Sequence, residues 1–152
     1  MSMQTSGRPS ILGHADGFAT QAQDLLLLAS RILFGWIFIA SGWRKLMDIP
    51  AFVKTMPNRG LPDFLGYIAP PVEFIGGLCI LLGFATRYAS AVMLLFLIIA
   101  SFSSHAYWTV PPAQYGNQNA HFWKNVSMMG GSVLLFATGA GRYALDRMLR
   151  RA

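Results

Sequence analysis

Four long apolar segments constrain this chain more than any other feature of its sequence. They cover residues 25–47, 62–83, 86–108 and 121–139. Each has roughly 19–23 residues, and a helix needs about 20 to cross a hydrocarbon core about 30 Å thick. No segment alternates apolar and polar residues with the period of two that a membrane barrel requires. We therefore predict an all-α integral membrane protein, folded as an antiparallel four-transmembrane-helix bundle.

The composition supports a membrane protein and excludes several other classes. The chain is 54% hydrophobic and 12% charged, whereas a soluble domain has about 25% charged residues. Its net charge is +6, but the basic residues lie mostly at the ends of apolar segments, as in membrane proteins. No basic segment alternates with exposed aromatic residues, which disfavours nucleic acid as a partner. The single cysteine, Cys79, excludes an internal disulfide and a redox-active cysteine pair.

The apolar segments divide the chain into three parts. We expect a flexible polar tail over residues 1–24, a transmembrane domain over residues 25–141 and a basic tail over residues 142–152. An even number of spans places both termini on one side of the membrane. The arginine cluster of the C-terminal tail favours the cytoplasm for that side, although the basic residues near the opposite side are almost as numerous. Asp24 is a suitable N-cap for the first span.

Two charged residues inside the spans suggest an ion pair. Arg31 lies about 10 Å into the first span at 1.5 Å per residue, and Glu73 is the one acidic residue in the interior of the four segments, since Asp63 lies at the start of the second. Charges inside a membrane normally face the bundle interior with a partner. Counting from the ends of the two segments places Arg31 and Glu73 at similar depth, so we predict a structural ion pair between them. Glycines on the same helix faces, at Gly35, Gly42, Gly76 and Gly77, predict close backbone packing of the two helices.

Polar groups gather at the end of the predicted bundle that lies away from the termini. Together with the two intramembrane charges they outline a polar funnel that reaches towards the middle of the membrane. The catalytic candidates are Glu73, His105 and His121. The ligand-binding candidates are Arg31, Phe38, Lys45, Glu73, His105, His121, Lys124 and Asn125, with Phe102 and Trp123 as further aromatic walls.

Each of these residues also has a purely structural interpretation. The tryptophans near the segment ends fit a membrane-interface belt, and Lys45 fits a side chain that extends to the interface.

His105 and His121 could be the axial ligands of a b-type haem, but no further ligand pattern supports one. The sequence has no Glu-x-x-His motif, and only one carboxylate lies in the interior of the spans. We therefore expect no metal site.

The order of these motifs resembles the DoxX family. Arg31, Gly35 and Ser41-Gly-Trp-Arg-Lys45 resemble its first helix, and Glu73-Phe-Ile-Gly-Gly-Leu78 with Leu82-Gly-Phe-Ala-Thr-Arg87 resembles its second helix and the turn after it. Lys124-Asn125, Gly130-Gly131 and the stretch from Gly139 to Asp146 complete the order. The resemblance implies a multi-pass protein of the bacterial inner membrane. The family takes its name from a subunit of an archaeal thiosulfate:quinone oxidoreductase.

The residues and the resemblance support three functional hypotheses. The first is an inner-membrane subunit or anchor of a redox or stress-response complex. The second is a quinone-reactive oxidoreductase subunit with its own site, in which the funnel holds the quinone, Glu73 relays protons and a partner supplies electrons. The third is a small-solute or proton pathway through Arg31 and Glu73, which would require a homo-oligomer because four helices leave little room for a pore.

Overall fold

The computed structural model describes residues 11–149, and within that range it is helical and has no strand. The long helices are α1 (Ile11–Leu46), α3 (Phe64–Leu82), α4 (Thr86–Ser104) and α5 (Pro112–Thr138). Short helices connect or follow them, namely α2 (Ile49–Val53), η1 (Pro57–Arg59), η2 (Tyr107–Thr109) and α6 (Leu145–Leu149). The predicted all-α class is therefore confirmed.

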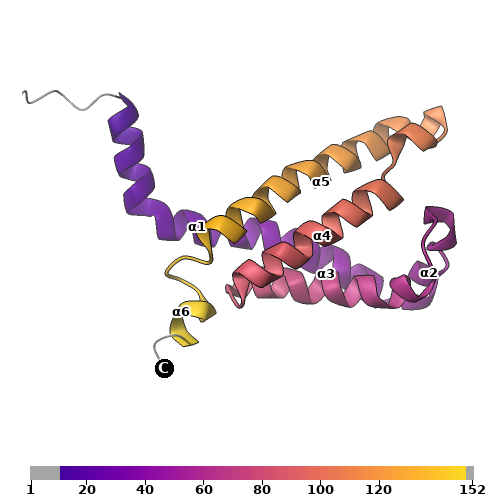
Figure 1. Cartoon of the computed structure of the whole chain (residues 1–152), viewed down its shortest axis with the longest axis horizontal. Helices are drawn as coiled ribbons and strands as arrows, with labels where there is room; N and C mark the ends of the chain where they lie inside the picture. Colours follow the sequence, from indigo (N-terminus) through magenta and orange to yellow (C-terminus); the bar gives the residue numbers. More distant parts are fainter. Residues whose placement is uncertain (1–10, 150–152) are drawn as a thin grey trace, which may run out of the picture.

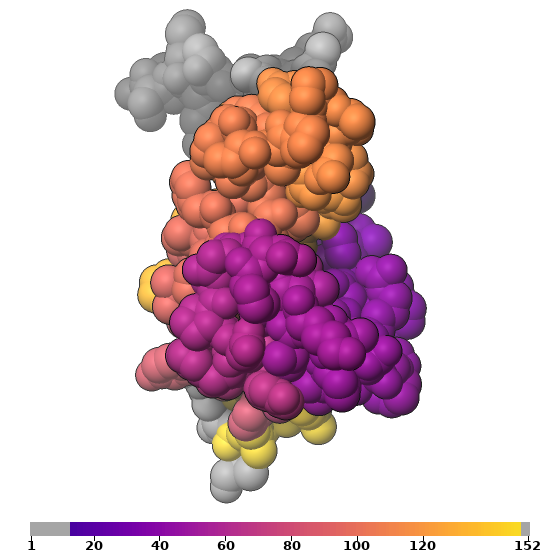
Figure 2. Space-filling model, turned by 90° about the vertical axis from the view of Figure 1, so that its right-hand side faces the viewer, coloured from indigo at the N-terminus to yellow at the C-terminus, as the bar shows by residue number. Residues whose placement is uncertain are grey.

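The long helices form two antiparallel pairs, α1 with α3 and α4 with α5 (Figure 1). The pairs meet at the turn between α3 and α4 and diverge towards the end that carries α2 and η2 (Figure 1). Figure 2 looks onto that open end, where the connection from α2 to η1 lies below the start of α5. The core lies where the pairs meet and consists of Phe38, Ile80, Met93, Leu97 and Leu135.

Three of the described helical segments are long and apolar enough to cross a membrane. They are Gly13–Leu46, Phe64–Leu82 and Thr86–Thr109. Helix α5 has 27 residues, which is about 40 Å at 1.5 Å per residue. Its first half is polar, with Gln114, Asn117, Gln118 and Asn119. Helix α5 is therefore not among the three segments that are apolar enough to cross a membrane. The structure thus shows a helical protein with three candidate membrane spans among the described residues.

The helix start predicted with Asp24 as its N-cap is wrong. Helix α1 begins at Ile11, so residues 11–24 are helical, and residues 1–10 lie outside the described part. Residues 13–21 are all exposed. Asp24 lies within the helix instead of capping it, and its carboxylate accepts a hydrogen bond of 2.7 Å from the backbone N–H of Arg142. The segment after α5, expected to begin a basic tail, is thereby held against α1.

The predicted glycine packing between α1 and α3 is confirmed. A Cβ placed on Gly42 would lie 2.7 Å from the backbone nitrogen of Phe74, and one on Gly77 would lie 2.9 Å from the carbonyl oxygen of Gly35. Both distances are shorter than carbon can approach nitrogen or oxygen, so these positions require glycine. The contacts fix the register of the two helices, because Gly42 lies opposite Phe74 and Gly35 lies opposite Gly77.

The tight turn between α3 and α4 is also as predicted. Gly83 ends α3 in the left-handed conformation at φ +69°, and the N–H of Phe84 bonds to the carbonyl of Cys79 at 2.8 Å. This is the arrangement in which glycine commonly ends a helix. Ala85 follows with φ +46°, a conformation that costs a residue with a side chain about 1–2 kcal/mol.

Candidate functional site

A groove of about 300 Å³ lies between the two helix pairs, towards the open end. Residues of α1, α3, α4 and α5 line it, together with the connection from α2 to α3. Most of the lining is apolar, which is also common in small-molecule sites, and it includes three phenylalanines, Phe38, Phe52 and Phe96. The polar lining residues with a chemical function are Lys45, Arg59, Glu73, His105, Lys124 and Asn125.

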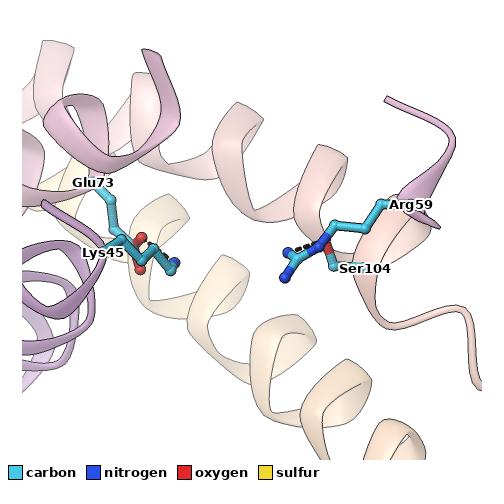
Figure 3. Close-up of polar contacts among 4 residues, drawn as sticks. All are labelled: Lys45, Arg59, Glu73 and Ser104. Atoms are coloured by element: carbon cyan, nitrogen blue, oxygen red, sulfur yellow. Dashed lines mark hydrogen bonds and ion pairs between the residues drawn. The ribbon is translucent and has the colours of Figure 1, made fainter. Parts of the chain in front are cut away.

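An ion pair between Lys45 and Glu73 lies in the groove. The ammonium of Lys45, near the end of α1, donates to Oε2 of Glu73 on α3 (Figure 3). The carboxylate is nearly buried, with 6% of its side chain exposed, whereas 27% of the Lys45 side chain is exposed. The Lys45 ammonium also lies 5.3 Å from the ring centroid of Phe52, within range of a cation–π contact. The pair therefore combines a charge, a hydrogen-bond donor and an aromatic wall.

The predicted ion pair between Arg31 and Glu73 is wrong. Arg31 is fully buried, but its guanidinium lies beside Gly83 and donates to the carbonyl of Tyr143. The glycine contacts explain the difference, because they place Gly42 opposite Phe74 and Arg31, eleven residues earlier, opposite the turn at Gly83. The prediction used the ends of the apolar segments to estimate depth. The register is instead set by helix packing.

Arg31 belongs to a second polar cluster, at the opposite end of the molecule from the open end. Asp146 lies within electrostatic range of Arg31. The carboxylate of Asp146 accepts hydrogen bonds from the backbone N–H groups of Ala85 at 2.6 Å and of Thr86 at 3.0 Å. It therefore caps the first turn of α4, where a negative charge is favourable. Arg31 does not line the groove, and its role here is to hold the segment after α5.

Arg59 lies at the outer part of the groove and was not recognised as a site residue from the sequence. Its Nη1 donates to the Oγ of Ser104 at 2.9 Å, which joins η1 to the end of α4 (Figure 3). The guanidinium carbon lies 5.2 Å from the ring centroid of Phe52. Partial burial lowers the pKa of Arg59 from its ordinary value. No sequence signal indicates this position, because Arg59 lies in a short connection that could direct its side chain either way.

His105 and His121 are brought together as predicted for one end of the bundle, but only His105 lines the groove. Their rings stack with centroids 5.0 Å apart and an angle of 29° between the planes. Nδ1 of His105 lies 2.8 Å from Oε1 of Gln118. Axial imidazoles bind a haem iron through ring nitrogens that point at it from opposite sides. Two stacked ring faces do not offer that arrangement, so these histidines do not fit a haem.

Helix α5 contributes Lys124 and Asn125 to the groove. Asn125 is buried, with 5% of its surface exposed, and Lys124 is within electrostatic range of Glu73 and Lys45. The two other predicted aromatic walls are not in the groove. Phe102 and Trp123 are 61% and 55% exposed. Phe52 and Phe96 take their place, and both were missed because one lies in a connection and the other within a uniformly apolar helix.

The groove thus offers a narrow apolar space with hydrogen-bond donors at several points. Lys45 and Glu73 can donate and accept a proton, and Arg59, His105 and Lys124 add polar groups around them. Across residues 11–149, histidine, cysteine and acidic side chains form no group of three that could hold a metal ion. The arrangement suits an apolar molecule that carries a few polar oxygens.

Comparison with known proteins gives a consistent relationship. The DoxX family model matches residues 26–106. The chain is similar to two proteins of Escherichia coli, the inner membrane protein YqjF, with 33% identity over 85% of this chain and 95% of YqjF, and the inner membrane protein YphA, with 34% identity over 83% and 91%. It is also similar to a Bacillus subtilis protein named "Putative oxidoreductase CatD", with 32% identity over 47% of this chain and 53% of CatD. No solved structure matches.

The family match covers more than half of the chain and includes the glycine contacts, the Lys45–Glu73 pair and the turn at Gly83. The two similar E. coli proteins are matched over nearly their whole length. The chain is a membrane protein of the DoxX family.

Proposed function

We propose that this protein is a membrane subunit of a redox complex and that it binds a quinone in the groove between the two helix pairs. The observation that carries the proposal is the pairing of an apolar, phenylalanine-lined space with the Lys45–Glu73 ion pair. The resemblance to the family of a quinone-linked oxidoreductase subunit supports it. The name of CatD also supports a redox role.

The groove fits the chemistry of a quinone ring. The ring is flat and apolar and carries two carbonyl oxygens that accept hydrogen bonds. Phe38, Phe52 and Phe96 supply apolar walls, and the Lys45 ammonium supplies a donor. Reduction of a quinone to a quinol takes up two electrons and two protons. In the proposal a partner subunit supplies the electrons, and Glu73 transfers protons.

The proposal includes four membrane spans. Helix α5 runs beside α4 over its full length, because Arg87 near the start of α4 donates to the carbonyl of Phe136 at 2.8 Å, and Phe102 near its end packs on Phe122 with ring centroids 5.7 Å apart. The second half of α5 therefore lies at the same depth as α4. Four spans place both termini on one side, and the arginines of the C-terminal segment favour the cytoplasmic face of the inner membrane.

The test is the quinone content of protein purified in a mild detergent from its native membrane. Organic extraction and mass spectrometry should find quinone in a fixed ratio to the wild-type protein. The double variant Lys45→Met/Glu73→Leu removes both polar groups and leaves no unpaired buried charge. It should keep the fold and lose the quinone.

Arg44→Met is the matched control, because Arg44 is a neighbouring, exposed cation outside the groove. This variant should retain the wild-type quinone content. Quinone retained by the double variant would show that the groove is not the site. A quinone-free wild-type protein that arrives with a fixed polypeptide partner would replace the proposal with the simpler one of a membrane anchor.

A further inference from the structure

The groove carries more positive than negative charge. Its lining includes three cations, Lys45, Arg59 and Lys124, and a single carboxylate, Glu73. Glu73 is paired with Lys45. In the part of the chain that the structure describes, neither Arg59 nor Lys124 has a carboxylate within ion-pair distance. Two cations therefore lie beside an apolar space without a carboxylate in direct contact.

Arg59 is partly buried and lines the groove. Its guanidinium points from η1 to the same space into which the Lys45 ammonium points (Figure 3). It donates to the neutral hydroxyl of Ser104. A basic side chain near a membrane surface commonly extends outwards to reach water. An inward guanidinium instead gives the groove a fixed donor that suits a phosphate group.

The same groove is open to the side between α3 and α4. Ile68 on α3 and Leu95 and Ile99 on α4 line it, yet they are 50%, 59% and 47% exposed. These residues lie within helices that can cross a membrane, so their exposed surfaces face lipid. An acyl chain can therefore enter the apolar part of the groove from the bilayer without crossing water.

We propose that the groove binds an anionic phospholipid of the surrounding bilayer. The phosphate lies between Arg59 and Lys124, and one acyl chain follows the apolar lining out between α3 and α4. His105 is within electrostatic range of both cations, which places it beside the head group. This inference goes beyond quinone binding and rests on charge and on the lateral opening. If both molecules bind, they compete for the apolar part of the groove.

The experiment uses native mass spectrometry of the full chain in a neutral detergent, with phosphatidylglycerol or phosphatidylcholine added. The two lipids share their acyl chains and differ in net charge. Wild-type protein should bind phosphatidylglycerol about tenfold more tightly, a difference of about 1.4 kcal/mol. Arg59→Gln should remove most of this preference. Lys54→Gln, which removes an exposed cation in the same connection but outside the groove, should leave it unchanged.

Two further variants keep the test decisive if Arg59→Gln does not fold. Arg59→Lys retains the charge and should retain part of the preference. Ala100→Phe fills the groove from α4 and should prevent the binding of either lipid while every cation stays in place. Equal binding of the two lipids by the wild type would overturn the proposal, and so would equal losses in Arg59→Gln and Lys54→Gln.

Oleate, added as a third ligand, distinguishes a phospholipid from a free fatty acid. Tighter binding of oleate than of phosphatidylglycerol would show that the occupant is wrong. The quinone measurement uses separate samples from native membranes. The two proposals can therefore fail independently.

Discussion

Asp146 provides the sharpest test of how the fold is held together. Its carboxylate accepts from two backbone N–H groups at the start of α4, at 2.6 and 3.0 Å, and lies within electrostatic range of the buried Arg31. A hydrogen bond to a charged group contributes about 1.5–3 kcal/mol, and loss of a helix N-cap costs about 0.5–2 kcal/mol. Because Asp146 is only partly buried, water replaces part of what is lost. We expect Asp146→Ala to lower the free energy of unfolding by about 2–4 kcal/mol.

The assay is thermal unfolding in detergent, followed by the fraction of protein that remains monodisperse. For a chain of this size about 1 kcal/mol shifts the Tm by roughly 2–4 °C, so a loss of about 2–4 kcal/mol lowers the Tm by roughly 4–16 °C. Asp146→Asn keeps one acceptor and should show an intermediate decrease. Asp63→Asn is the matched control, because Asp63 precedes α3 without a side-chain capping bond. Equal effects at Asp146 and Asp63 would refute the capping role.

Three further predictions test the packing described above. Lys45→Met alone should destabilise the protein by about 1–3 kcal/mol, because it leaves the buried Glu73 unpaired, and adding Glu73→Leu should restore most of the loss in the same thermal assay. Gly77→Ala should lower the free energy of unfolding by about 1–3 kcal/mol, because the added methyl group meets the backbone of α1. Gly130→Ala, where a Cβ meets nothing within 4 Å, should leave the stability unchanged or raise it. Equal changes in stability for the two variants would disprove the close packing. Ala85→Gly should raise the Tm by a few degrees by removing the strain of its positive φ, and a decrease would contradict it.

The sequence predicts local features of this fold well. The helical class follows from the lengths of the apolar segments, and Gly83 marks the turn between α3 and α4. The glycines at Gly35, Gly42 and Gly77 correctly indicate where α1 and α3 pack closely. In each case the physical reason lies in a few neighbouring residues, so the pattern can be read without knowing the rest of the structure.

Longer-range contacts could not be predicted in the same way. Arg31 pairs with the segment after α5, more than one hundred residues away in sequence, and nothing in its own helix indicates this. Helix α1 continues to Ile11 because exposed polar residues can extend a helix beyond the membrane. Arg59 and Phe52 reach the groove from a short connection. Their positions depend on the divergence of the two helix pairs, which the sequence does not encode in any local pattern.

Photolabelling with an azido-quinone tests the central claim most directly. The full chain would be labelled in its native membrane, and the attachment sites mapped by mass spectrometry. The account predicts attachment to groove residues, Phe38, Phe96 or Met128, and a large decrease in the variant Lys45→Met/Glu73→Leu. Two results together would contradict it. The label would attach mainly to Leu134, which is 66% exposed on α5 and lies outside the groove, and the wild type and the double variant would be labelled equally.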